Sequence, residues 1–346
     1  MGIWYATREQ LKSALDSRET ARNNAQVDRA LESASRAVET EFHRRFYPEI
    51  AIRTFDWPNR QYARPWRLWL DQHELTAVTE LVAGGVTIGP GEFLLRPDHG
   101  PPFTHVEINL GSGAALAAGD THQRAIAITG TFGYPGIEAP AGQLTGAVDA
   151  VATTVDVTDS ATADIGALLR AETERMVVAG RRMLDTGQTL GADLPAQANT
   201  VTVPVQNGDA YQLGETLQLD GEKMLVVEIA GDTLTVVRSW DGSPLAAHTT
   251  GAVVFAPRRL TVQRGVLGTT AAAHADATAL GRHQPPGPIT TYTRALGINQ
   301  ILQETAGYAR TVGSAENERE AAGRGLRSAR AEAWTGYARK SRKRAV

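Results

Sequence analysis

The chain has 346 residues, of which 42% are hydrophobic and 21% are charged, and its formal net charge is −3. A chain of this length can bury one large core or two ordinary ones, so one to three globular domains are expected. Cysteine is absent, which excludes disulfides, Cys-ligated zinc, iron–sulfur clusters and thiol nucleophiles. The sequence predicts neither a membrane span nor a secretory signal, because no long apolar run is present and the N-terminus lacks the signal pattern.

The first fifty residues are predicted to be helical. Thr7 and Gln10 have the spacing of a capping box at the start of one short helix. A second helix is predicted from Gln26 to about Phe46, because apolar residues recur there every three or four positions. These apolar residues are Val27, Leu31, Ala34, Val38 and Phe42. The stripe that they form is expected to pack in a core.

Between about 50 and 132 the hydrophobic pattern changes to alternation. Leu68 and Leu70 alternate with polar or bulky neighbours, and Val106 and Ile108 do the same. The turn 89–91 separates two further short apolar runs. Alternation of this kind predicts four or five short strands that form a small antiparallel sheet.

Residues 145–283 are rich in Val, Thr, Gly and Ala and contain internal repeats. The segment LTVVRSWDGSPLAAH (234–248) aligns without gaps to LTVQRGVLGTTAAAH (260–274). Other pairs match at a displacement of 48 residues, and these are Val155/Val203, Val157/Val205, Gly166/Gly214, Leu169/Leu217, Glu174/Glu222 and Met176/Met224. Duplicated strand–turn units predict an all-β module with its own core. We expect the module to be separable, so that its deletion leaves a soluble protein.

Two kinds of polar residue within the repeats lead to structural predictions. The repeated pairs Arg238/Arg264 and His248/His274 are each expected to tie a loop back onto its strand. Glu172 and Glu174 alternate along a predicted strand and are expected to face solvent.

The chain becomes helical again after the prolines at 285–288, and prolines at 135 and 140 precede the β-rich region. This bracketing predicts an insertion. The predicted fold class is α+β, with a helical host domain that contains the small antiparallel sheet, plus an inserted all-β module. The predicted domains are a host formed by 1–140 and 284–318, an inserted module at 141–283, and a basic C-terminal tail at 319–346.

A search for catalytic motifs finds none. The segment GSGAALAAG (111–119) lacks the third glycine of a dinucleotide-binding loop, and a turn explains it better. The eight histidines are scattered, and none has metal-ligand spacing with a second ligand on one element. We therefore predict no catalytic residue, no cofactor and no metal, and a protein that is not an enzyme.

The C-terminal tail is strongly basic. Residues 319–346 contain nine basic and two acidic residues, a net charge of +7. Glycines at 323, 325 and 336 add chain entropy, so the tail is expected to be poorly ordered alone. It could be a solvated end, a nucleic-acid contact, or a docking segment for an acidic protein surface. The interleaved aromatic residues favour docking, because phosphate contacts need no aromatic side chain. The predicted contact residues are Arg327, Arg330, Trp334, Tyr337, Arg339, Lys340, Arg342, Lys343 and Arg344.

Four segments, taken in order, resemble the head–tail connector (adaptor) proteins of long-tailed bacteriophages. They are HRRF (43–46), LWLD (68–71), LTAVTEL (75–81) and GTFGYP (130–135). The resemblance covers roughly 25–135 and 284–312. The β-rich region departs from the minimal family and is similar to the GTTAAAH-type repeats of phage structural proteins.

The resemblance implies a structural virion protein at the neck between capsid and tail, assembled in the host cytoplasm. Such a protein forms a homo-oligomeric ring, commonly twelve-fold, beneath the portal protein, and packaged DNA passes through its channel. Its further partner is the next connector (stopper) or a tail terminator protein, and no membrane is involved. Connectors of this family often grip the portal with their C-terminal part. The alternative function is a ligand- or glycan-binding, or decoration, module carried by the β insertion.

Overall fold

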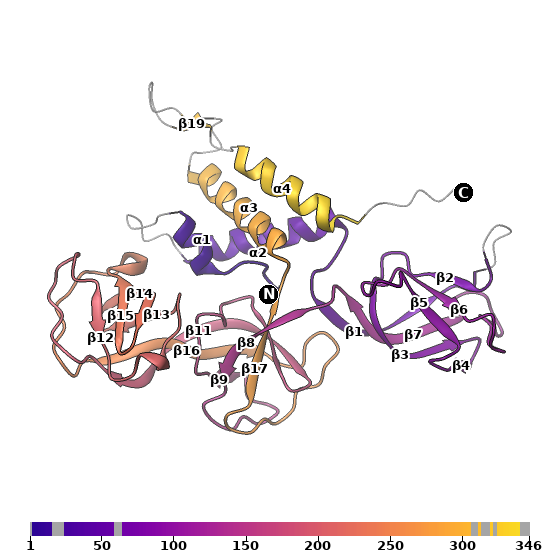
Figure 1. Ribbon diagram of the computed structural model, residues 1–346, viewed down its shortest axis with the longest axis horizontal. Helices are drawn as coiled ribbons and strands as arrows, with labels where there is room; N and C mark the ends of the chain where they lie inside the picture. The colour runs from indigo at the N-terminus through magenta and orange to yellow at the C-terminus, as the bar shows by residue number, and fades with distance from the viewer. Residues whose placement is uncertain are drawn as a thin grey trace. The chain divides into compact units, whose positions relative to one another are not determined.

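The computed structural model describes residues 2–15, 24–58, 64–305, 311–312, 319–320 and 324–339 (Figure 1). The chain forms two compact units. The first unit comprises Met1–Val38, Glu138–Val266 and Thr270–Tyr337, and the second comprises Glu39–Ile137, Leu267–Thr269 and Ala338–Val346. Within the described residues, no helix combines the length and the apolar character needed to cross a membrane.

The predicted fold class is wrong, because the protein is mostly β. The described chain contains a ten-stranded sheet, a four-stranded sheet, a three-stranded sheet and a two-stranded ribbon, but only four α-helices. The small sheet is not embedded in a helical host domain. It forms a β unit of its own, whereas most of the helical residues belong to the unit that contains the ten-stranded sheet. Hydrophobic periodicity predicted the type of several elements, but it carried no information on which elements share a core.

The second unit is built from two antiparallel sheets. One has the strand order β1-β7-β3-β4 and the other the order β2-β6-β5. The strands are β1 (Pro48–Phe55), β2 (Arg67–Trp69), β3 (Leu75–Ala83), β4 (Val86–Ile88), β5 (Phe93–Arg96), β6 (His105–Ile108) and β7 (Ile126–Gly133). Every second residue of β7 is buried. Ile126, Ile128 and Phe132 are among them and share one apolar core with Leu68, Leu81 and Val106. The strands predicted between 66 and 130 are therefore confirmed. The prediction of one small sheet with four or five strands is wrong, because seven strands form two sheets.

The ten-stranded sheet lies in the first unit. Its strand order is β12-β15-β14-β13-β16-β11-β10-β17-β8, and β9 pairs with β16. The strands are β8 (Ile137–Gln143), β9 (Thr154–Asp156), β10 (Leu168–Ala171), β11 (Glu174–Thr189), β12 (Thr202–Pro204), β13 (Thr216–Leu219), β14 (Glu222–Ala230), β15 (Thr233–Val237), β16 (Val253–Gln263) and β17 (Ala279–Gln284). Two short 3₁₀ helices, η1 (Gly208–Ala210) and η2 (Trp240–Gly242), and the ribbon β18 (Thr311–Val312) with β19 (Arg319–Glu320) complete the elements.

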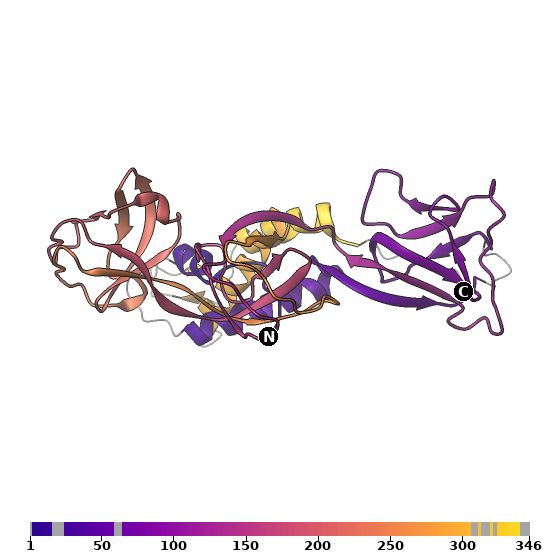
Figure 2. The ribbon, with the colours of Figure 1, turned by 90° about the horizontal axis from the view of Figure 1, so that it is seen from below.

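The large sheet contains two repeat modules, one nested inside the other. The first repeat module comprises 138–178 and 260–284, and the second comprises 190–256, because each of these sets has its own apolar core. The long strands β11 and β16 pair along their length and connect the modules (Figure 2). The repeated Glu and Arg are 16 residues apart in the second module but 90 apart in the first. The additional 74 residues between Glu174 and Arg264 correspond to the second module and the segments that connect it to the first.

Three helices of the first unit pack around the N-terminal segment and Ile165 of the first module, and the fourth packs against the third. They are α1 (Arg8–Ala14), α2 (Asn24–Phe42), α3 (Gly287–Thr305) and α4 (Arg324–Tyr337). The predicted capping box of α1 is confirmed, because the Thr7 hydroxyl accepts from the Gln10 N–H and the Gln10 side chain accepts from the Thr7 N–H. Leu11 of α1 and Leu31 of α2 share an apolar cluster with Trp4 and Ile165. Figure 1 shows α3 and α4 side by side.

The predicted apolar stripe of α2 is confirmed, since all five of its side chains are buried. Phe42 ends the helix, and its ring meets that of Phe46 edge-on at a centroid distance of 6.0 Å. We expect Phe42→Ala to lower the free energy of unfolding by about 3–5 kcal/mol, because it leaves a cavity in a closed core. Chemical denaturation would measure this loss, with Ser33→Ala on the exposed face of α2 as the control. Equal stabilities of the two variants would contradict the assignment.

Candidate functional site

Helix α4 carries three of the predicted contact residues on one exposed face. Its other face packs against α3, with Ala333 fully buried. Arg327, Arg330 and Trp334 are exposed and follow the i, i+3, i+7 spacing of a single helix face. The Arg330 guanidinium lies 5.6 Å from the centroid of the Trp334 ring, a cation–π arrangement that holds both side chains on this face. We call this set the α4 face.

The other predicted contact residues follow the α4 face along the chain. Tyr337 and Arg339 are half-buried. Arg339 belongs to the second unit, where burial, Arg53 and Arg339 together lower the pKa of His73. Lys340, Arg342, Lys343 and Arg344 lie outside the described residues.

The expectation that the tail is poorly ordered alone is wrong for residues 324–337. These residues form α4, and the helix includes Gly325 and Gly336, two of the glycines that were expected to disorder the tail. Leu326, Ala329 and Ala333 recur at helical spacing and are half-buried or buried. Packing of this short apolar stripe against α3 offsets the charge repulsion and the entropy of the glycines. Alanine-rich stripes with a single leucine give a weak periodicity signal, which explains why sequence analysis missed the helix.

A buried glutamate in each repeat module binds the repeated arginine and histidine. In the first module the Glu174 carboxylate accepts two hydrogen bonds of 2.6 Å from Arg264 and faces His274 Nε2 at 2.8 Å. It also accepts from the backbone N–H groups of Gly265 and Ala272, both at 3.0 Å. Glu174 was predicted to face solvent, which is wrong, because its side chain is completely buried. The neighbouring Glu172 is exposed and contacts the other nitrogen of His274.

The second module repeats the cluster with Glu222, Arg238 and His248. Arg238 donates two hydrogen bonds of 2.7 Å to Glu222, and His248 Nε2 lies 3.1 Å from the same carboxylate. Asp220, the counterpart of Glu172, lies 2.7 Å from His248 Nδ1. Because each glutamate is surrounded by protein donors, neither cluster leaves an open position for a ligand.

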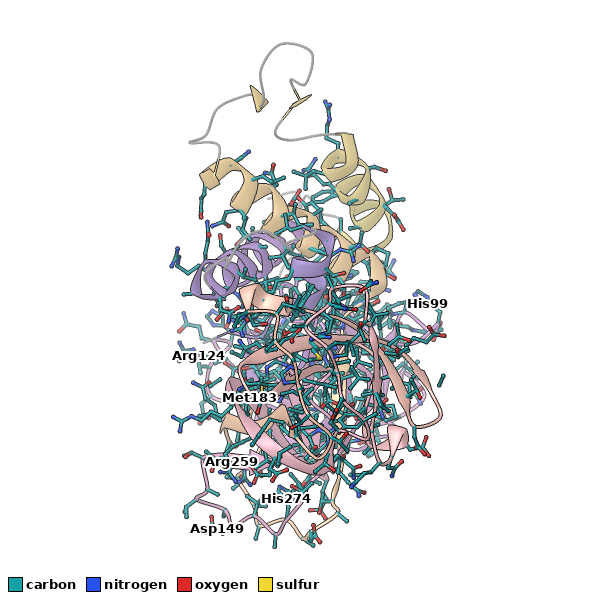
Figure 3. The ribbon with its side chains drawn as sticks, turned by 90° about the vertical axis from the view of Figure 1, so that its left-hand side faces the viewer. His99, Arg124, Asp149, Met183, Arg259 and His274 are labelled. Carbon is teal, nitrogen blue, oxygen red and sulfur yellow. The ribbon has the colours of Figure 1, made fainter. Side chains whose placement is uncertain are left out.

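Each cluster fastens a loop to its strand, which confirms the role predicted for the repeated Arg and His. Arg264 also donates to the carbonyl oxygens of Asp149, Ala152 and Ala272 (Figure 3 shows Asp149 and His274). Arg238 makes the equivalent bonds to three carbonyls in the second module. Burial raises the pKa of each glutamate, but the arginine, backbone and histidine hydrogen bonds outweigh it and hold both pKa values at about 2.

A second buried cluster fastens α1 to the β modules. Arg181 on β11 lies 2.9 Å from both Glu9 and Asp164, and the Arg8 backbone N–H donates to Asp164 at 2.5 Å. Burial raises the pKa of Glu9 to about 7, although Arg181 opposes the shift. For Asp164 burial also raises the pKa, but Arg181 and Arg8 outweigh it, so the pKa is lowered. Lys12 pairs with Asp241 of the second module.

A cavity of about 270 Å³ lies beside α1, between Lys12, Thr216, Lys223 and Asp241. Both lysines of the cavity pair with Asp241. Arg181 also lines the cavity, and it pairs with Glu9 and Asp164. Across the described ranges, no three His, Asp or Glu side chains converge to form a metal site.

The contact residues predicted from the sequence lie in the basic tail, and three of them lie together on the α4 face. The sequence did not predict that the repeated glutamates Glu174 and Glu222 bind the repeated Arg and His. Their match at a displacement of 48 residues was the signal that could have indicated this role. Comparisons of this chain with models of protein families, with curated proteins and with solved structures find no match.

Proposed function

We propose that this protein is a non-enzymatic structural subunit of a bacteriophage neck. Twelve copies would form a ring beneath the portal protein, extend the DNA channel, and present a platform to a stopper or tail terminator protein. The ring would assemble in the host cytoplasm, and in the mature virion it would lie at the junction between capsid and tail. The ordered set of four connector-like segments at 43–46, 68–71, 75–81 and 130–135 supports this proposal.

The observation that carries the proposal is the α4 face. Two arginines and an exposed tryptophan are held on a packed helix, and Lys340, Arg342, Lys343 and Arg344 follow a few residues later. An aromatic side chain among cations suits a protein partner of acidic character, because the ring buries apolar area while the arginines pair with carboxylates. We propose the acidic surface of the portal as that partner.

Ring symmetry would make weak contacts sufficient. A single exposed ion pair contributes about 0–1 kcal/mol. When every subunit of a ring engages a ring-shaped partner, the later contacts become intramolecular, and the overall affinity rises far above that of one contact.

Charge reversal on the α4 face tests this function. We expect the double variant Arg327→Glu with Arg330→Glu to bind purified DNA-free portal at least about tenfold more weakly than the wild type, because two attractive pairs become repulsive. Sedimentation with portal would measure binding. The matched control is Arg124→Glu with Arg182→Glu, which reverses two exposed cations outside α4. Circular dichroism would verify that α4 remains helical.

Two outcomes would contradict portal docking. If the double variant binds portal as well as the control does, the α4 face is not the contact. If it keeps portal binding but loses affinity for duplex DNA, the cations face the DNA in the channel instead.

A further inference from the structure

Side chains of α1, η2 and the large sheet line the cavity beside α1. The strands β13, β16 and β11 are neighbours in that sheet, and they contribute Thr216, Pro257 and Met183 to the lining (Figure 3 labels Met183). Thr216 faces the cavity, because the next residue, Leu217, belongs to the module core on the opposite face of β13. The volume of about 270 Å³ is several times the roughly 30 Å³ that one water molecule occupies in the liquid. The cavity therefore has room for a small organic molecule.

Two polar groups of the lining are buried without a partner. Thr216 is 7% exposed, and the side chain of Arg181 is 8% exposed. Among the residues that the structure describes, neither the Thr216 Oγ1 nor the Arg181 Nε has a hydrogen-bond partner. A buried donor without a partner destabilises a fold. Two such donors at one cavity indicate a ligand that accepts hydrogen bonds.

The first repeat module shows that the fold does not require the polar residues of this lining. Thr216 matches Leu168 at the displacement of 48 residues, and Leu168 is buried. Asp241 matches Leu267 in the alignment of 234–248 with 260–274. Both of these residues have a left-handed backbone, with φ of +59° and +56°. Since the same scaffold accepts leucine at both positions, threonine and aspartate in the second module indicate a role in binding.

The charges around the cavity leave a place for one anion. The cations of the lining are Arg8, Lys12, Arg181 and Lys223. The carboxylates that pair with them are Asp28, Asp241, Glu9 and Asp164. Burial raises the pKa of Glu9 to about 7, and Asp164 adds to the rise, whereas Arg181 and Lys12 oppose it. When Glu9 is protonated, these described groups have one positive charge in excess.

We propose that this cavity binds a small organic monocarboxylate. The Thr216 Oγ1 and the Arg181 Nε would donate hydrogen bonds to its oxygens, since both lack another acceptor among the described residues. The apolar part of the ligand would contact Trp240, Met183 and Pro257, which also line the cavity. A ligand with a single negative charge matches the single positive charge in excess. The site lies within one subunit, so it does not depend on the proposed ring.

Isothermal titration calorimetry of the full-length chain with butyrate at pH 6 tests the site. We expect butyrate to bind at least about tenfold more tightly than butyramide, which has the same size and no charge. Thr216→Val removes the hydroxyl but keeps the shape of the side chain, and we expect it to weaken butyrate binding about tenfold. Thermal denaturation without ligand should show no loss of stability in this variant. The matched control is Thr202→Val, an exposed threonine of the same module, which should bind like the wild type.

The pH dependence of binding tests the charge argument separately. Butyrate stays ionised from pH 6 to pH 8, whereas Glu9 loses its proton in this range and adds a negative charge to the cavity. We expect the wild type to bind butyrate about fivefold more weakly at pH 8 than at pH 6. Glu9→Gln keeps the shape of the side chain without the charge, so we expect it to bind butyrate equally at both pH values.

Four results would overturn the proposed site, and none of them bears on the ring. The first is a wild type that binds no butyrate at pH 6 at concentrations up to tens of millimolar. The second is butyramide binding as tight as that of butyrate, which would show that the cavity does not select an anion. The third is equal butyrate affinity of Thr216→Val and Thr202→Val, which would place the anion elsewhere. The fourth is tighter binding of inorganic phosphate than of butyrate, which would exclude the carboxylate class. A pH dependence that persists in Glu9→Gln would contradict the role of Glu9.

Discussion

Replacing Glu222 by glutamine is expected to lower the free energy of unfolding by about 3–5 kcal/mol at neutral pH. The substitution removes the negative charge that the buried Arg238 faces and leaves an uncompensated cation in the core of the second module. The amide also presents one oxygen acceptor where the carboxylate offers two. Glu174→Gln in the first module is expected to have a similar effect, because Arg264 occupies the equivalent position.

The matched control for Glu222→Gln is Asp220→Asn in the same module. Asp220 contacts the same histidine, but its side chain is 69% exposed, so we expect a loss below about 1 kcal/mol. Urea denaturation would compare the variants. Equal losses for Asp220→Asn and Glu222→Gln would show that the buried cluster does not hold the module together.

The same cluster predicts how stability depends on pH. The pKa of Glu222 is about 2 in the folded protein and near 4.5 for an ordinary glutamate. A group with a lowered pKa stabilises the fold fully above its unfolded pKa, and this contribution is lost as the pH falls through the folded value. The stability gap between the wild type and Glu222→Gln is therefore expected to narrow from pH 5 towards pH 2. A constant gap over this range would contradict the low pKa.

Deleting residues 141–283 and joining the ends with a short Gly/Ser linker is expected to unfold the helices of the first unit. The sequence had suggested a separable insertion whose removal leaves a soluble protein. In the structure the deletion removes Ile165 from the cluster around Trp4 and removes Arg181 from Glu9. Trp4 and Leu11 thereby lose the apolar cover of Ile165, and each apolar side chain that becomes exposed to water costs about 1.5–3 kcal/mol. Loss of helical circular dichroism and of solubility would report this result.

A smaller deletion provides the control. Leu190 and Ala252 lie near the two ends of the second module, and the Leu190 N–H donates to the Ala252 carbonyl at 2.9 Å. Removal of 191–251 with a two-residue turn therefore leaves the first module, Ile165 and Arg181 in place. It also removes Asp241, the partner of Lys12, together with the part of the module that covers Lys12, so this lysine becomes accessible to water. We expect this protein to remain folded and helical. If both deletions leave folded proteins, the first module is dispensable for the helices, and the shared core is not essential.

Local patterns in the sequence determined most individual elements. The Thr7–Gln10 spacing predicted the cap of α1, and the stripe from Val27 to Phe42 predicted the buried face of α2, because both depend on residues within one or two turns. Alternation predicted β2, β6 and β7 for the same reason. The repeated Arg and His also predicted a structural tie correctly, since duplication reveals residues that serve the same purpose twice.

Tertiary structure alone decided how these elements combine. Glu174 looked like a solvent-facing residue until the chain brought Arg264, 90 residues away, against it. The nesting of one module in the other, the shared core of Trp4 and Ile165, and the order of α4 depend likewise on contacts between distant segments. A sequence pattern specifies which face of an element avoids water, but not which partner covers it. That choice depends on the packing and ion pairing of the whole chain.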